Sequence, residues 1–177
     1  MHREFDPPSK GRIDGRTSSI TAAFFQAITP VIPPSDAEVD EAIAGLGMEP
    51  GRCCCAYCGD PLTEWDHFRP IVKGRQPTGY ITEIANLVPA CGKCNQSKGN
   101  KHWKEWMLSD AARSPKKRGI PDLTERIAKL ESYERWREPV RIDYAVIVGQ
   151  QRWSHYYELL DAAVAHLSAC QQPRKLR

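Results

Sequence analysis

The sequence lacks any long hydrophobic run, and this absence argues against a membrane-spanning protein. No window approaches the ~18 uninterrupted apolar residues that mark a membrane helix. The first eight residues lack the apolar stretch of a secretory signal, so we expect an intracellular, cytoplasmic protein. There is no internal repeat. With 177 residues, 41% of them hydrophobic and 27% charged, the composition predicts a soluble, globular chain of one or two domains.

The chain also lacks a strong net charge, but its charges are unevenly distributed. The formal net charge is only +3. Residues 53–119 carry eleven Lys and Arg against six Asp and Glu, whereas residues 1–52 are acidic and residues 120–177 are nearly balanced. A local basic excess is typical of a surface that faces a polyanion, although an ordinary solvated face gives the same pattern.

Cysteine is plentiful by comparison, with seven in the chain. In a reducing compartment, cysteines in pairs of ligand spacing favour a metal site over disulfides. Two Cys-x-x-Cys pairs have that spacing: Cys55 with Cys58, and Cys91 with Cys94. Four thiolates complete a tetrahedral zinc site with no open position, so we expect a structural Zn²⁺ ion rather than a catalytic one.

Cys54 is an alternative to Cys55 as the first ligand. We favour Cys55, because Gly59 directly after the first pair can take the positive φ that such a turn often needs. Cys53, Cys54 and Cys170 are then interpreted as ordinary thiols.

The two cysteine pairs are separated by 32 residues, more than the ~15 to 20 of a simple zinc ribbon. Residues 63–68 and 87–89 read as short strands, and apolar spacing predicts a helix that begins at or just after Cys94 and includes Trp103 and Trp106. The order strand, loop, strand, helix predicts an α+β fold that zinc fastens at both ends.

Three residues in this segment have the chemistry of a hydrolytic site. Asp66 and Asn95 offer oxygen ligands of the kind that Mg²⁺ or Mn²⁺ prefers. A neutral His67 beside them can take a proton from water. Adjacent residues on a regular strand point to opposite faces, so Asp66 and His67 can share a site only if the strand bends or ends there.

The motifs together resemble the HNH endonucleases. The resemblance covers about residues 53–108 and rests on the two cysteine pairs, Asp66-His67, Asn86-Leu-Val-Pro, Asn95 and Lys98-Gly99. It implies a zinc-stapled ββα-metal core, treble-clef-like, with flanking helices.

The resemblance also implies a role for each motif residue. His67 corresponds to the general base, Asp66 to a metal ligand, and Asn86 to the residue that tethers the loop and orients the base. Asn95 stands where the family often has His, as in its HNN variants, and this departure favours Mg²⁺ at the catalytic position.

The segments around the motif predict four parts of the chain: a flexible arm over residues 1–16, N-terminal helices over 17–52, the nuclease core over 53–112, and a C-terminal helical region over 113–177. A Ser35/Glu38 capping box marks a helix in the second part. Residues 139–148 are ambiguous between a strand and an extended connection. Trp103 and Trp106 are assigned to packing, and His102 is expected to face solvent or contact phosphate.

DNA is the predicted partner, most simply as a double strand. Lys98 and Lys101 lie on the predicted motif helix, where backbone N–H groups favour phosphate. Lys93, Lys73 and Arg75 are weaker candidates, and solubility explains any single lysine equally well. Cutting both strands with one site would favour a homodimer.

The sequence therefore predicts a metal-dependent DNA endonuclease with structural Zn²⁺ and catalytic Mg²⁺ or Mn²⁺, and a role in restriction or anti-phage defence. Two alternatives stay open. One is a zinc-dependent nucleic-acid-binding module without catalysis. The other keeps the nuclease chemistry in a homing, phage-packaging or toxin system.

Overall fold

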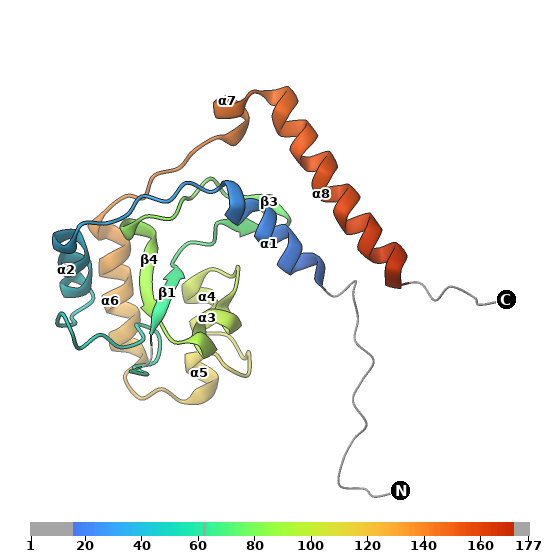
Figure 1. Ribbon diagram of the computed structural model, residues 1–177. Helices are drawn as coiled ribbons and strands as arrows, with labels where there is room; N and C mark the ends of the chain where they lie inside the picture. The colour runs from blue at the N-terminus through green and yellow to red at the C-terminus, as the bar shows by residue number, and fades with distance from the viewer. Residues whose placement is uncertain (1–15, 62, 172–177) are drawn as a thin grey trace, which may run out of the picture. The chain divides into compact units, whose positions relative to one another are not determined.

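The structure is a computed structural model that describes residues 16–61 and 63–171 (Figure 1). The predicted arm, apart from Arg16, lies outside the described residues. Within the described part of the chain, no helix has the length and apolar character that crossing a membrane requires. The chain divides into two compact units, one formed by Met1–Phe24 with Tyr144–Arg177 and the other by Phe25–Asp143.

The elements follow one another as short helices and strands. In chain order they are α1 (Thr17–Ile28), α2 (Asp36–Gly45), β1 (Glu64–His67), β2 (Val72–Lys73), β3 (Gln76–Pro77), the 3₁₀ helix η2 (Ile84–Asn86), β4 (Leu87–Ala90), α3 (Gly92–Lys98), α4 (Trp103–Met107), α5 (Pro115–Arg118), α6 (Leu123–Trp136), α7 (Tyr144–Val148) and α8 (Gln150–Gln171).

The second unit is built on β1, β4 and α3. β1 and β4 pair antiparallel, with Asp66 opposite Val88 and His67 opposite Leu87. β4 leads directly into α3, whose N-cap is Cys91. This confirms the predicted α+β class, and both predicted strands lie within one residue or two of their observed bounds.

The helix predicted to run from Cys94 past Trp103 is in fact two helices. α3 ends at Lys98, because Gly99 follows in a positive-φ conformation (52°) that side chains rarely adopt. α4 then begins at Trp103. The break changes the direction of the chain before His102, so His102 does not continue the helix that carries Asn95.

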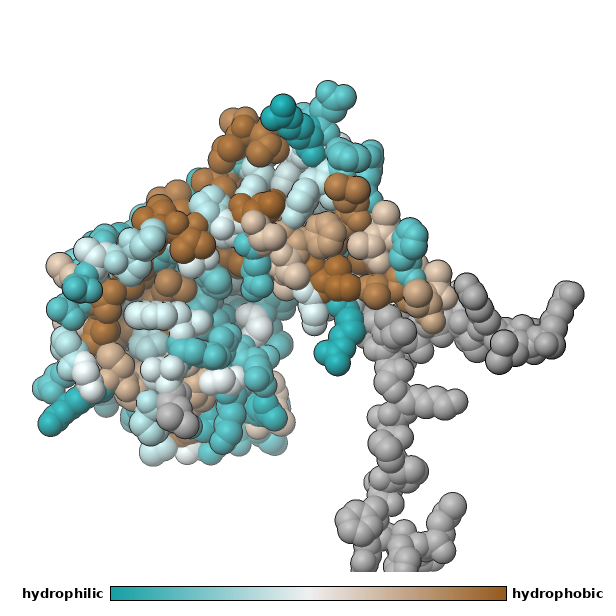
Figure 2. All heavy atoms as spheres, in the orientation of Figure 1, coloured by the Kyte–Doolittle hydropathy of each residue, from teal (hydrophilic) through white to brown (hydrophobic). Residues whose placement is uncertain are grey.

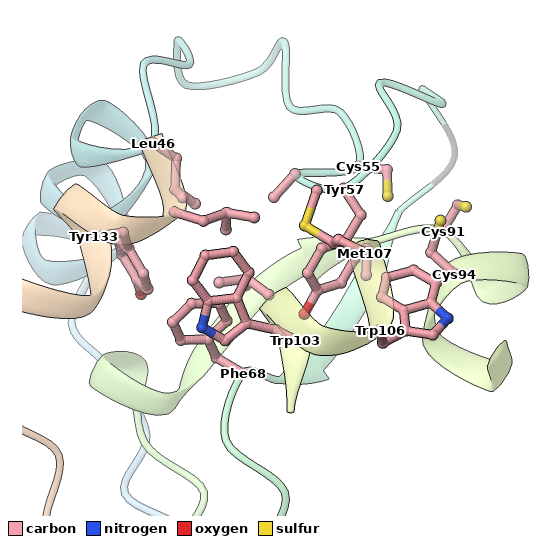
Figure 3. Packing of buried hydrophobic residues seen from close by; sticks show 14 of the residues in the cluster. Leu46, Cys55, Tyr57, Phe68, Cys91, Cys94, Trp103, Trp106, Met107 and Tyr133 are labelled. Carbon is pink, nitrogen blue, oxygen red and sulfur yellow. The ribbon is translucent and has the colours of Figure 1, made fainter. Parts of the chain in front are cut away.

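Aromatic side chains join the small sheet to the helices around it (Figure 3). The ring of Phe68, just beyond β1, stacks on Trp103 of α4 at 5.1 Å and meets Tyr133 of α6 edge-on at 5.9 Å. The Tyr133 hydroxyl lies 2.8 Å from the carbonyl oxygens of both Ile84 and Leu87. All three rings are almost fully buried, so packing fixes the strand pair against α4 and α6.

α2 contacts α6 on the side of the unit away from α3 (Figure 1). The predicted capping box is present: the Ser35 hydroxyl accepts the Glu38 amide, and the Glu38 carboxylate accepts the Ser35 amide. Such a cap contributes about 1 kcal/mol to helix stability. Arg137, just after α6, pairs with Glu38 and Glu41 of α2.

The long loop between β1 and β4 is held by backbone pairing. β2 and β3 form a two-residue antiparallel pair inside the segment predicted as loop. Thr82 bridges to Val31 and Tyr80 bridges to Arg141, which brings two flanking segments against the loop. The ambiguous residues 139–148 are therefore extended at Arg141 and helical from Tyr144 onward.

In the other unit, aromatic rings hold α7 and α8 together. Trp153 of α8 stacks on Tyr144 of α7 at 5.1 Å, and the Tyr156 hydroxyl bonds the carbonyl of Phe24. Val146 and Ile147 of α7 are 80% and 62% exposed, and Figure 2 shows the hydrophobic patch over α7.

Candidate active site and zinc centre

The two cysteine pairs form a single cluster. The four sulfur atoms of Cys55, Cys58, Cys91 and Cys94 lie within 4.8 Å of one another, and those of Cys58 and Cys91 are 3.7 Å apart. Tetrahedral Zn²⁺ with Zn–S bonds of about 2.3 Å requires sulfur atoms about 3.8 Å apart. The spacing therefore fits a zinc ion, and Cys55 rather than Cys54 belongs to the cluster (Figure 3).

The first cysteine pair lies in a tight turn, and the second lies at the start of a helix. The amides of Cys58 and Gly59 both donate to the Cys55 carbonyl, and Gly59 has the positive φ (82°) that this turn requires. A side chain at Gly59 would also meet the Arg126 guanidinium at 2.6 Å. The second pair begins at the N-cap of α3.

The four thiols influence one another electrostatically. Hydrogen bonds from Cys55 and Cys94 lower the pKa of Cys58, and the same contacts with Cys58 raise the pKa of Cys55 to about 12. Arg118 adds a guanidinium N–H 3.4 Å from the Cys94 sulfur. A zinc ion would displace the remaining protons, and Arg118 would offset part of the negative charge of four thiolates.

Asp66 faces the zinc side of β1 and is 4% exposed. Tyr57 lies between Cys55 and Cys58 in the sequence, and its hydroxyl donates a hydrogen bond to Asp66 Oδ2 at 2.8 Å. The Lys98 ammonium lies 3.2 Å from Oδ1 and 3.1 Å from Oδ2. Burial raises the pKa of Asp66, while Lys98 and the Tyr57 hydrogen bond act in the opposite direction and favour the carboxylate.

His67 is the last residue of β1, and its ring is held from the loop. Its Nε2 lies 2.8 Å from the Thr82 hydroxyl. Burial, and then the nearby Lys98 ammonium, lower the pKa of His67. The strand does end here as the shared site requires, but the two side chains keep separate partners.

Asn86 tethers the loop that follows His67. Its Oδ1 accepts the Arg69 amide at 2.8 Å, and its Nδ2 donates to the carbonyls of Arg69 and Ile81 at 3.1 and 3.2 Å. Asn86 is fully buried, so these bonds have no competition from water. One amide thus fixes both ends of the loop.

Asn95 lies on the first turn of α3 and faces β1. Its Nδ2 donates to Glu64 Oε1 at 2.8 Å, which leaves Oδ1 without a partner among the described residues. An ionised carboxylate has about four acceptor positions. Tyr57 and Lys98 occupy up to three of those positions on Asp66, so at least one acceptor position of its carboxylate lies beyond these contacts.

The five predicted DNA contacts separate into two groups. Lys73, Arg75, Lys93 and Lys101 are exposed on the surface. Lys98 is completely buried and, besides Asp66, its ammonium donates to the His67 carbonyl at 2.8 Å. The structure therefore places Lys98 inside the site rather than on its surface.

Three residues with contacts to the site were not singled out from sequence: Tyr57, Thr82 and Glu64. Glu64 had a usable signal, because it lies two residues before Asp66 and alternate strand residues share a face. Tyr57 and Thr82 lie 9 and 15 residues from the side chains they contact, and no periodic pattern links them.

Comparison with known proteins agrees with this geometry. Residues 55–101 match the model of a family described as HNH endonuclease. The CRISPR-associated endonuclease Cas9 of Corynebacterium diphtheriae is 45% identical over 59 residues, which are 31% of this chain and 5% of that relative. The chain thus matches only a small part of the relative's length. No solved structure matches the chain. Residues 55–101 are therefore a domain of the HNH endonuclease family.

Proposed function

We propose that the protein is a metal-dependent endonuclease that hydrolyses phosphodiester bonds in DNA. The observation that carries the proposal is the pair at the end of β1, within the HNH domain. Asp66 is a buried carboxylate paired with a lysine, and His67 is a histidine whose ring is anchored through one nitrogen. A carboxylate ligand and an oriented base are the two groups that hydrolysis with one metal ion needs.

His67 acts as the general base. Its lowered pKa keeps the imidazole neutral at neutral pH, which a base requires. Thr82 engages Nε2, so Nδ1 is the ring nitrogen that faces the attacking water when Nε2 carries the proton. Thr82 itself is fixed by its backbone, because its amide donates to Pro30 and its carbonyl accepts from Ile32.

Asp66 and Asn95 hold the divalent cation, Mg²⁺ or Mn²⁺. When bound, the cation stabilises negative charge on the scissile phosphate and the leaving oxygen. Glu64 orients the Asn95 amide so that its oxygen is the ligand atom. Lys98 opposes the rise that burial causes in the pKa of Asp66, and its bond to the His67 carbonyl joins α3 to the end of β1.

DNA contact falls to the exposed cations around this site: Lys73, Arg75, Lys93 and Lys101. Phosphate contacts of this kind position the duplex but carry no sequence information. Double-stranded DNA as substrate, a homodimer that cuts both strands, and a role in restriction or anti-phage defence remain predictions. Sequencing the ends cut from a randomised DNA library tests the last, because defined ends indicate restriction.

Plasmid cleavage with added Mg²⁺ tests the proposal. His67→Ala should lower the cleavage rate by about 10²- to 10⁴-fold, the usual contribution of general base catalysis, with zinc content and circular dichroism unchanged. His155→Ala, an exposed histidine on α8, is the matched control and should cleave like the wild type. The wild-type rate should fall on the acid side only below pH ~6.5, the ordinary histidine value, because the pKa of His67 is lowered.

Full activity in His67→Ala would show that the base is wrongly assigned. A zinc-loaded wild type that binds DNA and cleaves none with Mg²⁺ or Mn²⁺ would favour the non-catalytic binding module instead.

A further inference from the structure

A pocket of about 240 Å³ is lined by none of the candidate catalytic residues, although it includes Lys73, one of the predicted DNA contacts. Its walls include Arg69, Lys73, Thr78, Tyr80, His102 and Glu134. Asn86 binds the backbone of Arg69, and the ring of Phe68, next to His67, stacks on Trp103, which in turn stacks on His102. These contacts place the pocket beside the end of β1. A group bound here would lie beside a phosphate held at the active site.

Cations outnumber acids in this pocket. Glu134 is the acidic member, and its carboxylate and carbonyl are already engaged by the Arg69 guanidinium at 3.5 and 3.2 Å. Lys73 therefore leaves an uncompensated positive charge in the pocket. The Arg69 Nη1 group is buried and has no hydrogen-bond partner in the described part of the chain, which is unfavourable unless a ligand supplies an acceptor.

Flat rings are the second feature of the pocket. The His102 ring stacks on Trp103 with centroids 5.9 Å apart, and His102 is exposed, so its other face is open. Two guanidinium groups lie over the Tyr80 ring, that of Arg69 at 5.8 Å and that of Arg141 at 5.1 Å from its centre. A fixed ring with an open face beside cations suits a nucleotide, whose base stacks and whose phosphate is anionic.

The size of the pocket narrows the choice of ligand. Sites for drug-sized molecules usually enclose about 300 to 1,000 Å³, and this pocket is smaller. It admits one nucleotide unit rather than a longer segment of a strand.

We propose that the pocket binds one nucleotide of the substrate DNA strand next to the scissile phosphate, with its phosphate near Lys73 and Arg69 and its base against His102. The proposal rests on the proposed function for its substrate class. It adds a subsite that uses none of the HNH motif residues. The subsite is formed by residues before, within and after the β2–β3 pair, by Glu134 of α6 and by His102 just before α4.

Binding experiments test the subsite without any cleavage. The zinc-loaded full chain is titrated with a fluorescein-labelled DNA duplex in the absence of Mg²⁺, at several salt concentrations. Lys73→Ala with His102→Ala should raise the Kd about tenfold, and Lys73→Ala alone should reduce the slope of log Kd against log salt by about one. Lys117→Ala on α5, an exposed lysine away from the pocket, should leave both values unchanged.

A second measurement separates the base from the phosphate. Deoxynucleoside 5′-monophosphates should shift the His102 ring resonances in NMR spectra more than inorganic phosphate does, because only the nucleotide can stack on the ring. Equal shifts from both ligands would overturn the base contact, and wild-type Kd and salt slope in the double variant would overturn the subsite.

These outcomes are independent of catalysis. A wild type that binds DNA through the pocket but never cleaves it would refute the proposed function and leave the subsite standing. If the wild type cleaves DNA but the pocket variants bind it normally, the proposed function stands and the subsite is refuted.

Discussion

Asp66 and His67 are neighbours on β1, but different regions of the molecule hold their side chains. Asp66 contacts Tyr57 from the first cysteine pair and Lys98 from α3, the helix that carries the second pair. We call the cysteine cluster, Tyr57 and α3 the zinc-side frame. His67 contacts Thr82, in the loop of residues 69–86 that Asn86 tethers, and we call this the loop-side frame.

The two frames differ in what makes them rigid. The zinc-side frame depends on a metal ion and on a buried ion pair between Lys98 and Asp66. The loop-side frame needs no metal, since it consists of amide and backbone hydrogen bonds around Asn86 and Thr82. A strand that alternates its side chains can therefore serve one site only because each face has its own support. The following changes separate the two frames, beginning with the largest expected effect.

Cys58→Ser should abolish the zinc-side frame. Structural zinc contributes about 10 to 16 kcal/mol in small zinc domains, as much as the entire stability of a typical domain. We therefore expect loss of bound zinc, measured by atomic absorption, together with loss of cooperative unfolding of the Phe25–Asp143 unit. Cys170→Ser, at an exposed thiol on α8, is the control and should change neither. A Cys58→Ser protein that keeps a native circular dichroism spectrum without zinc would show that the frame does not need the metal.

Asn86→Ala should loosen the loop-side frame while zinc stays bound. The substitution removes three hydrogen bonds and leaves the Arg69 amide without its acceptor. The cost should be about 3 kcal/mol in the free energy of unfolding, measured with urea at saturating zinc. Asn86→Asp keeps the acceptor for the Arg69 amide but loses the donors to the carbonyls of Arg69 and Ile81. It also buries a carboxylate against those two carbonyls, so it should cost at least as much as Asn86→Ala. A change below about 0.5 kcal/mol for Asn86→Ala, the size of an ordinary surface substitution, would contradict the tether.

The sequence is informative where function follows from spacing. The cysteine cluster, the strand pair and the α+β class follow from ligand spacing and local pattern, and these predictions are confirmed. The break after α3 was signalled by Gly99, but the helical spacing of Trp103 and Trp106 favoured a continuous helix, and that prediction is wrong.

Contacts between side chains that lie far apart in the sequence could not be predicted from the sequence alone. Lys98 looked like a surface lysine on a helix, and only tertiary packing places its ammonium at Asp66. Tyr57 and Thr82 likewise reach their partners through the zinc turn and the loop bridge, whose geometry depends on the folded chain. The catalytic roles of His67, Asp66 and Asn95 stay predictions.

The smallest expected effects give the sharpest test of the two frames. Tyr57→Phe and Thr82→Val each remove one hydroxyl and nearly preserve shape, so each loses one hydrogen bond worth about 1 kcal/mol. Tyr57→Phe should raise the Mg²⁺ concentration needed for half-maximal cleavage about fivefold, with little change in rate at saturating Mg²⁺.

Thr82→Val should instead lower the saturating rate about tenfold without changing the Mg²⁺ requirement, because the His67 ring loses its orientation. Thr82→Ser keeps the hydroxyl and should restore most of the rate. If both hydroxyl deletions altered the same parameter, Asp66 and His67 would be supported as one unit, and the division into two frames would fail.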